Sequence, residues 1–298
     1  MEGSQIPSVH LFLLYKAGGV RHSSARNHAS LTQGLRAERE RGEWRTCSAS
    51  KRRIMWRLGR VTRKIYSGSS HPRLPSTTWL GMWAPAALAR LYKRLVATDT
   101  SQEQLSFAPR LPNIDYRHTP PTLSPTDLHQ HVAPPSTVDL VCVAQALHWL
   151  DLPTFYDGVN SVLAKPGGVL AVWCYTEPRV DPAVDTVFWR LYTESGRFWA
   201  AARQMVDDEY RSLLFPYDPV DGEESTGPFE FAAERAMDMG TYLTYIRSWS
   251  AYQTAKERGV ELLTDGMVSD LEKAWGGDGK AVKVVRFPIF LRIGKVRT

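Results

Sequence analysis

An aspartate that follows a short apolar run is the first candidate for binding chemistry. Residues 95–98 read Leu-Val-Ala-Thr and predict a strand, and Asp99 comes directly after them. In nucleotide-binding sheets, an acidic residue at the end of the second strand accepts hydrogen bonds from the ribose hydroxyls. Aspartate also stabilises turns that bind nothing. Asp99 alone is therefore a weak indication of a ribose site.

A second group of candidates follows the most apolar segment of the chain. Residues 138–144 read Val-Asp-Leu-Val-Cys-Val-Ala and predict a parallel strand that is buried on both faces. His148 and Trp149 come shortly after it, and we expect them to face a ligand at the strand's carboxyl end. A structural hydrogen bond also explains a histidine at this place, and for His148 taken alone that explanation is slightly the better one.

Other chemistries find little support. His129-Gln130-His131 has a metal-like spacing, but it lies in a proline-rich connection without a cysteine or carboxylate cluster, so we predict no metal site. Hydrolase, phosphate-loop and catalytic-triad motifs are absent, and no catalytic residue can be named. Three scattered cysteines (Cys47, Cys142 and Cys174) favour a cytoplasmic protein with reduced thiols.

The elements that position these residues alternate between helix and strand. Apolar spacing and Pro/Gly boundaries predict helices at 85–93, 152–163 and 265–275, and a helix after Ser101, which is a candidate N-cap. Strands are predicted at 95–98, 114–118, 138–144, 169–175 and 282–293, with Pro288 marking an edge or a bulge. This alternation indicates an α/β fold with a doubly wound sheet.

Residues 176–260 have a different character. They are rich in Trp, Tyr and Phe and are predicted to form mostly helix and loop. We expect this insert to cover the ligand side of the sheet, although a packed core is the commoner fate of aromatic side chains.

Charge divides the chain into two segments. Residues 1–75 hold 15 Lys and Arg against four Glu, whereas residues 76–298 hold 22 basic and 27 acidic side chains. The basic segment shows no apolar period, and we predict that it is largely disordered and separate from a domain at 76–298. A nucleic-acid-binding arm, an organellar transit peptide and sequence never selected for a fold are the three interpretations; we favour the last. No apolar run is long enough to span a membrane, so a membrane is not an expected partner. A nucleic acid is not an expected partner either, because a density of Lys and Arg attracts phosphates without specificity. No pattern specifies the oligomeric state.

Four segments taken together resemble a known family. They are Val-Ala-Thr-Asp-Thr-Ser at 96–101, the run 138–149 that ends in Ala-Gln-Ala-Leu-His-Trp, Lys-Pro-Gly-Gly at 165–168 with the strand after it, and Arg-Ser-Trp-Ser at 247–250. They resemble the class I S-adenosylmethionine-dependent methyltransferases, and among them the type 11 group of plants and fungi that is similar to trans-aconitate methyltransferase. The resemblance covers roughly residues 84–298.

This resemblance implies a seven-stranded Rossmann-like methyltransferase sheet, S-adenosylmethionine as cofactor and a small-molecule acceptor. It implies that Asp99 holds the ribose, that Thr119 lies near the adenine, and that Ala144 and Gln145 border the methionine moiety. The residues implied to line the substrate side are His148, Trp149, Tyr175, Arg247 and Trp249. Arg247 would pair with the carboxylate of the acceptor if the acceptor is an acid.

The chain departs from the family at the first strand. Members of the family end that strand with Asp-x-Gly-x-Gly-x-Gly, but residues 77–84 read Thr-Thr-Trp-Leu-Gly-Met-Trp-Ala, and no Gly-x-Gly occurs in residues 1–84. The simplest interpretation is that a normal first strand and glycine loop are missing and that residues 1–83 are foreign to the fold, as in an altered splice form or gene model. Two further functions therefore stay open: a non-catalytic relative that has lost donor binding, and a nucleic-acid binder that uses its basic arm.

Overall fold

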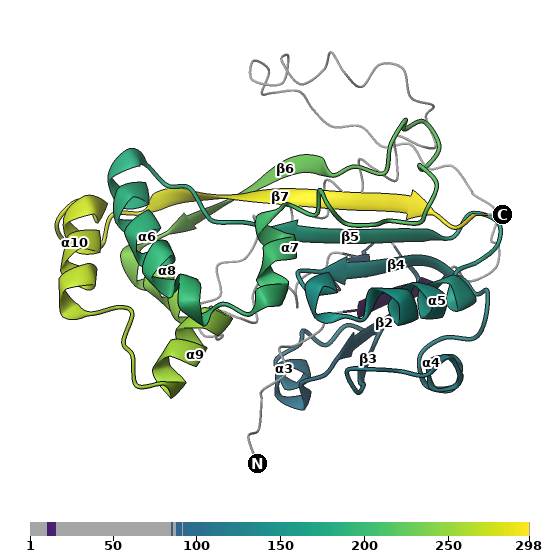
Figure 1. The fold of residues 1–298 in the computed structure, drawn as a ribbon. Helices are drawn as coiled ribbons and strands as arrows, with labels where there is room; N and C mark the ends of the chain where they lie inside the picture. The colour runs from purple at the N-terminus through teal and green to yellow at the C-terminus, as the bar shows by residue number, and fades with distance from the viewer. Residues whose placement is uncertain (1–10, 16–84, 86–87, 91, 298) are drawn as a thin grey trace, which may run out of the picture.

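The computed structural model describes the backbone of residues 11–15, together with residues 85, 88–90 and 92–297. Its centre is a seven-stranded sheet with the strand order β3-β2-β1-β4-β5-β7-β6 (Figure 1). This confirms the predicted α/β fold. The strands are β1 (Leu11–Tyr15), β2 (Arg94–Asp99), β3 (Ile114–His118), β4 (Val138–Ala144), β5 (Val169–Tyr175), β6 (Phe229–Met237) and β7 (Lys283–Lys295).

Strand β1 occupies the place between β2 and β4, and it runs antiparallel to both. Leu11 is paired with Thr98 and with Val143, at the carboxyl ends of β2 and β4, and Tyr15 is paired with Arg94 near the start of β2. The prediction that all of residues 1–75 stand apart from the domain is therefore wrong for residues 11–15. The rest of that segment lies outside the described residues, so its predicted disorder stays a prediction.

Both faces of the sheet are buried, as the continuous apolar strands predicted. Side chains alternate along each strand, so Leu140 and Cys142 of β4 point into one apolar core while Val141 and Val143 point into the other. In β5, Ala171 and Trp173 belong to the first core, and Leu170 and Val172 belong to the second. Among the described residues, no helix is long and apolar enough to cross a membrane.

Short capped helices connect the strands of the first half of the sheet. The Ser101 hydroxyl accepts a hydrogen bond from the Gln104 N–H at the start of α3, which confirms the predicted cap. The connection between β3 and β4 contains α4, which the sequence analysis took for a loop; Ser124 caps it and Pro125 opens its first turn. The helices of this half are α3 (Gln102–Ser106), α4 (Pro125–His131) and α5 (Leu152–Val162).

The remaining helices lie beyond the carboxyl ends of β4 and β5, on the left in Figure 1. We call this group the cap. Most of its aromatic side chains form packed core: Phe188, Tyr242 and Trp275 are fully buried. The cap comprises α6 (Pro182–Ser195), η2 (Gly196–Phe198), η3 (Ala201–Arg203), α7 (Gln204–Asp207), α8 (Met239–Arg247), α9 (Ser250–Glu257) and α10 (Asp265–Trp275).

Strand β6 corrects the prediction of helix and loop for residues 176–260. Its nine residues pair antiparallel with β7, and Ala233, Arg235 and Met237 are buried while Glu234 and Ala236 are exposed, which is the period of a strand. β7 is a single strand. Its last seven residues also pair with β5, whereas Pro288 lies just before that double pairing begins at Ile289. Pro288 therefore needs only one paired side, as the edge prediction required.

Candidate functional site

The carboxyl ends of β2, β4 and β5 lie along one edge of the sheet, where ligands bind in doubly wound folds. Asp99 ends β2 at this edge, and its side chain is almost completely buried. Its Oδ1 accepts a hydrogen bond of 2.7 Å from the Ser101 N–H, and its backbone carbonyl accepts one of 3.0 Å from the Thr119 N–H. The structure thus brings Asp99 and Thr119 together at this edge, and their roles toward a ligand stay predictions.

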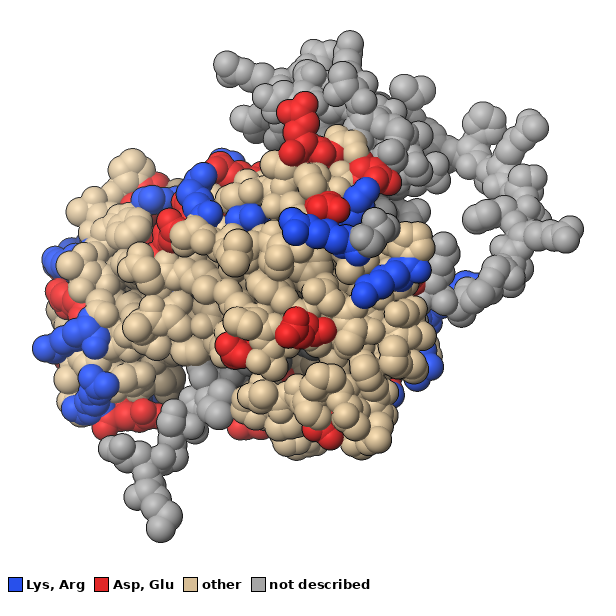
Figure 2. Space-filling view, turned by 45° about the vertical axis from the view of Figure 1, so that its right-hand side comes forward, with Lys and Arg blue, Asp and Glu red and all other residues tan. Residues whose placement is uncertain are grey.

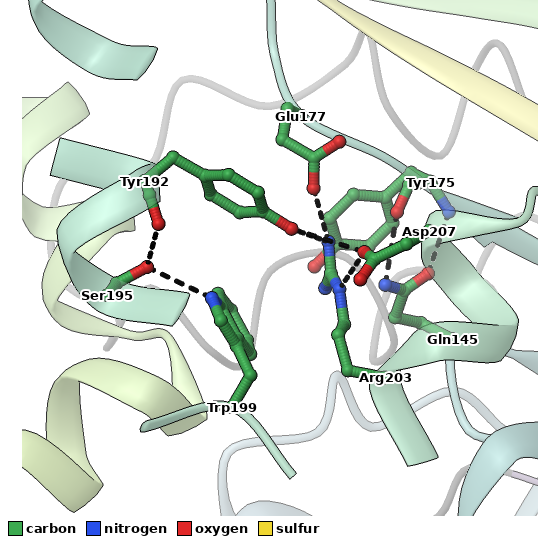
Figure 3. Close-up of polar contacts among 8 residues, drawn as sticks. All are labelled: Gln145, Tyr175, Glu177, Tyr192, Ser195, Trp199, Arg203 and Asp207. Carbon is green, nitrogen blue, oxygen red and sulfur yellow. Dashed lines mark hydrogen bonds and ion pairs between the residues drawn. The ribbon is translucent and has the colours of Figure 1, made fainter. Parts of the chain in front are cut away.

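Ala144 and Gln145 lie at the end of β4, and their geometry is specific. Ala144 is buried as the last residue of the strand, and Gln145 has a positive φ of 53°, which turns the chain sharply out of the sheet. The Gln145 side chain then continues the sheet hydrogen bonding: its Oε1 accepts from the Tyr175 N–H at 2.7 Å, and its Nε2 donates to the Tyr175 carbonyl at 3.1 Å. Both ends of its amide therefore help to join the ends of β4 and β5 (Figure 3).

His148 and Trp149 form a short 3-10 turn, η1 (Leu147–Trp149), directly after this junction. Their rings are tilted against each other with centroids 4.8 Å apart. The His148 Nδ1 is buried and has no hydrogen-bond partner among the described residues. Burial and the positive charge of Arg203 lower the pKa of His148 to about 3, so the ring is neutral at physiological pH and can accept a hydrogen bond.

Aromatic rings of the cap cover the end of β5. Trp249 is buried and lies with its ring centroid 5.7 Å from that of Trp199 and 5.9 Å from that of Tyr192. Tyr175, the last residue of β5, packs edge-on against Phe287 at 6.1 Å. Burial raises the pKa of Tyr175 to about 12, against the opposing effect of Arg203 and Arg235, so its hydroxyl keeps its proton.

A polar cluster that the sequence analysis missed lies at the centre of this wall. We call it the Arg203 cluster; it consists of Glu177, Tyr192, Arg203 and Asp207 (Figure 3). Arg203 donates from Nη2 to Glu177 at 2.6 Å and from Nε to Asp207 at 2.8 Å. Tyr192 donates from its hydroxyl to Asp207 at 3.1 Å. The guanidinium also lies 4.5 Å from the Trp199 ring centroid, in a cation–π contact.

The electrostatics of the cluster favour a permanent cation. The side chains of Arg203 and Glu177 are only 14% and 13% exposed, so solvent screens their ion pair weakly. Burial opposes the charge of Arg203, but Tyr192, Glu177 and Asp207 outweigh it and raise the arginine's pKa. Nη1 of Arg203 has no hydrogen-bond partner among the described residues, so it is the part of the guanidinium that a ligand can use.

The residues of this cluster differ in how well they could have been predicted from the sequence. Glu177 comes two residues after the predicted strand 169–175, and a polar residue at that distance from a strand end is a recognisable signal. Nothing local marks Arg203, which becomes important only because η3 folds back against η1.

Arg247 has a different environment from Arg203. Its side chain is exposed at the end of α8 and lies near Tyr252, whose hydroxyl donates to Glu261. The structure places Arg203, and not Arg247, beside His148 and Tyr175. Arg203 is therefore the guanidinium next to these two predicted residues, and the role of Arg247 stays a prediction.

Within the described part of the chain, no group of His, Cys, Asp and Glu side chains could hold a metal ion. His129 lies in α4, and its Nε2 is 2.8 Å from the Ser161 hydroxyl, which is a structural contact between α4 and α5. Figure 2 shows acidic and basic side chains interspersed on one face of the molecule, with a broad uncharged area between them. On that face, the described residues form no continuous basic surface of the kind that nucleic acids require.

Comparisons with known proteins agree on one family. The sequence model of the methyltransferase domain matches residues 81–172. The solved structure of a type II methyltransferase from Anaeromyxobacter dehalogenans is 31% identical, with a TM-score of 0.59, and the alignment covers 71% of this chain and 84% of that one. A Dictyostelium discoideum protein described as a methyltransferase is 29% identical over 219 residues, which are 71% of this chain and 78% of the relative. A Saccharomyces cerevisiae protein described as an S-adenosylmethionine-dependent methyltransferase is 27% identical over 140 residues, covering 40% of this chain and 48% of the relative.

Proposed function

The chain belongs to the S-adenosylmethionine-dependent methyltransferases, and from that membership we propose that it methylates a small molecule. The observation that carries this proposal is the Arg203 cluster together with the rings around it. A buried guanidinium and four aromatic side chains (Tyr175, Tyr192, Trp199 and Trp249) lie at the carboxyl ends of β4 and β5. A site of this kind suits a small ligand with an apolar body and one polar group. The similarity to trans-aconitate methyltransferase, as proposed from the sequence, points in the same direction.

The described residues offer a place for the ribose of S-adenosylmethionine but not for its methionine moiety. Asp99 stands where a ribose-binding carboxylate is required, and Thr119 lies beside it. The turn that would meet the methionine half is not provided by β1, because Tyr15, its last residue, lies at the opposite edge of the sheet from Asp99. The chain's one Gly-x-Gly, Gly277-Asp278-Gly279, follows α10 and leads into β7, so it does not end a strand and open a helix as the family's motif does. The methionine half therefore has no matching site among the described residues.

We propose a carboxylic acid as the acceptor class, with Nη1 of Arg203 as its partner. Nη1 of Arg203 carries two N–H groups that point in different directions, so one of them can donate to a carboxylate oxygen while Glu177 and Asp207 hold the guanidinium in place. A carboxylate is already ionised at neutral pH, so this acceptor needs no base, and the neutral His148 would serve as a hydrogen-bond acceptor rather than a proton carrier.

A panel of small acids tests this proposal. The full chain is incubated with methyl-labelled donor and a set of dicarboxylic and tricarboxylic acids, each with its amide analogue. We expect base-labile methyl esters of one or more acids and no labelling of the amides. Arg203→Lys should raise the KM for the acid at least about tenfold, because a lysine cannot reproduce the planar fork, whereas Arg247→Lys should leave it unchanged. Labelling of amines or alcohols alone would overturn the acid class and leave the methyltransferase itself standing.

A second candidate function is a relative of these enzymes that no longer binds the donor. It is supported by the antiparallel direction of β1 and by the absence of Gly-x-Gly from residues 1–84. Titration calorimetry of the full chain with S-adenosylmethionine separates the two. Binding in the micromolar range favours the enzyme, and no heat at millimolar donor favours the non-catalytic relative.

A further inference from the structure

A segment that packs on β7 connects the Arg203 cluster to the end of that strand. Residues 208–218, which we call the strap, begin directly after Asp207, whose carboxylate accepts a hydrogen bond from Arg203. The strap ends at Asp218, whose backbone N–H and carbonyl bond to the backbone of Lys295 at 3.0 and 2.9 Å. Lys295 is the last residue of β7 and is paired with the first residue of β5. The strap therefore runs from the ligand edge of the sheet to the other edge.

The first turn of the strap has an unusual backbone. Glu209 and Tyr210 both have a φ of 58°, in the left-handed region that residues other than glycine rarely adopt. The Glu209 N–H donates to the Val206 carbonyl and the Tyr210 N–H donates to the Met205 carbonyl, so this turn closes the end of α7. A turn of this kind persists only where the surrounding structure holds it. Because Asp207 lies at its start, the conformation of the turn fixes the place of the Asp207 carboxylate.

Arg292 of β7 holds this turn from the other side. Its side chain is largely buried, since the whole residue is only 8% exposed. Nη1 donates to the carbonyls of Tyr210 and Leu213 at 3.0 and 3.3 Å, and Nη2 donates to the Thr226 hydroxyl at 3.0 Å. The guanidinium also lies 5.2 Å from the ring centroid of Phe215 in the strap. One planar group thus binds two carbonyls and one ring of the same short segment.

The far half of the strap is held by close packing. A Cβ at Gly294 would lie 2.5 Å from the Tyr217 Cβ and 2.9 Å from the Asp218 carbonyl oxygen, so only glycine lets the strap approach β7 so closely. Burying a guanidinium in a strand of apolar residues costs solvation that an apolar side chain would keep. At Arg292 this cost is offset by hydrogen bonds that fix the strap, which points to a role in positioning.

We propose that Arg292 is a positioning residue for the acceptor site. It holds the first turn of the strap, the turn fixes Asp207, and Asp207 together with Glu177 fixes the guanidinium of Arg203. The proposal rests on the proposed function in one respect, which is that Arg203 binds the acid. The link from Arg292 to Arg203 is a property of the folded chain and can be measured without any substrate.

Hydrogen exchange at the Arg203 Nε–H tests that link in the isotope-labelled full chain by NMR, with the signal assigned by its loss in Arg203→Lys. We expect exchange at least about tenfold faster in Arg292→Met, because two hydrogen bonds from a charged group to the strap are lost. Arg292→Lys keeps the charge without the planar fork; it should show a smaller change in the same direction and is the milder variant for folding. Val141→Ala is the control, because it opens a cavity in the same apolar core without touching the strap.

Steady-state kinetics with the acid found in the panel provide the second measurement. Arg292→Met should raise the KM for the acid at least about threefold with kcat unchanged, whereas Val141→Ala should change neither. A loss of overall stability would not separate KM from kcat in this way.

The outcomes distinguish this proposal from the proposed function. Unchanged Arg203 exchange in the folded Arg292 variants would overturn the proposal, and so would equal acceleration in Val141→Ala, which would trace the effect to overall stability. Faster exchange with an unchanged KM would also overturn it, because the position of Arg203 would then not govern acceptor binding. Faster exchange confined to the Arg292 variants, with no acid methylated, would confirm the link from Arg292 to Arg203 and overturn the acid as acceptor.

Discussion

The sheet is held together differently on the two sides of β4. On the β5 side, β7 pairs with seven residues of β5 and nine of β6, and the buried pair of Arg203 and Glu177 connects the cap to the end of β5. On the β2 side, five residues of β1 join β2 to β4, and short parallel strands complete the edge. The β5 side, which we call the acceptor side after its proposed ligand, is therefore secured by side-chain contacts as well as strand pairing. The β2 side, which we call the donor side after its proposed ligand, is joined to β4 by the backbone pairing of one short strand.

This difference has a functional meaning. The residues proposed to bind the acceptor are fixed by several independent contacts, so their geometry does not depend on β1. The residues proposed to bind the donor include one well-held carboxylate, Asp99, beside a strand that runs against the usual direction. On these proposals, the acceptor half of the site is built without β1, whereas the donor half lies next to it.

The largest effect is expected from Arg203→Ala. It leaves the buried Glu177 without its cation, and removing one partner of a buried pair costs about 3–5 kcal/mol of unfolding free energy. Asp207 adds less, because its side chain is 37% exposed and water screens it. Urea unfolding followed by circular dichroism measures the loss. Arg297→Ala, which removes an exposed pair with Asp218, is the control and should cost less than about 1 kcal/mol. Equal costs for the two variants would mean that the Arg203 cluster does not secure the acceptor side.

A proline in β1 tests the donor side. β1 is paired on both sides, so Leu13→Pro removes an N–H from the ladder and leaves a buried carbonyl of a neighbouring strand without its donor, at a cost of about 2–3 kcal/mol. Leu13→Val keeps the N–H and is the matched control. Hydrogen exchange should show faster exchange of amides in β2 and β4 in the proline variant, with β6 and β7 unchanged. An unaltered urea midpoint for Leu13→Pro would mean that β1 contributes nothing to the stability of the sheet.

The smallest effect is a pH dependence that comes from His148. Its pKa is lowered to about 3 in the folded protein, so below the ordinary value of 6.5 the unfolded chain binds a proton that the folded chain does not. Stability contributed by the neutral ring is therefore lost as the pH falls from 6.5 towards 3, by about 1 kcal/mol over the first pH unit. Urea unfolding at pH 7, 6 and 5 should show a flatter profile for His148→Asn than for the unaltered chain. His131→Asn, at the exposed end of α4, should keep the original slope.

The regular elements were predictable from sequence wherever the local pattern and the final environment agree. Strands β2, β3, β4 and β5 and helices α5 and α10 follow apolar runs with clear caps or Pro/Gly boundaries. β6 was missed because Ala-Ala-Glu-Arg-Ala at 232–236 favours a helix locally, and it forms a strand because β7 offers a nine-residue edge. α4 was missed because the prolines and histidines of this connection were read as a loop, although Ser124 caps a helix start there.

The sequence by itself determined the family, the doubly wound sheet and the place of Asp99 and His148 at strand ends, because these depend on periodicity and on motifs within short segments. Only the tertiary structure decided the direction of β1 and the importance of Arg203. Leu11–Tyr15 is apolar throughout, and such a run has no feature that selects a parallel or an antiparallel neighbour; the edges of β2 and β4 make that choice. Arg203 lies 26 residues from Glu177 along the chain, and no local pattern records a contact that exists only after the cap has folded over the end of β5.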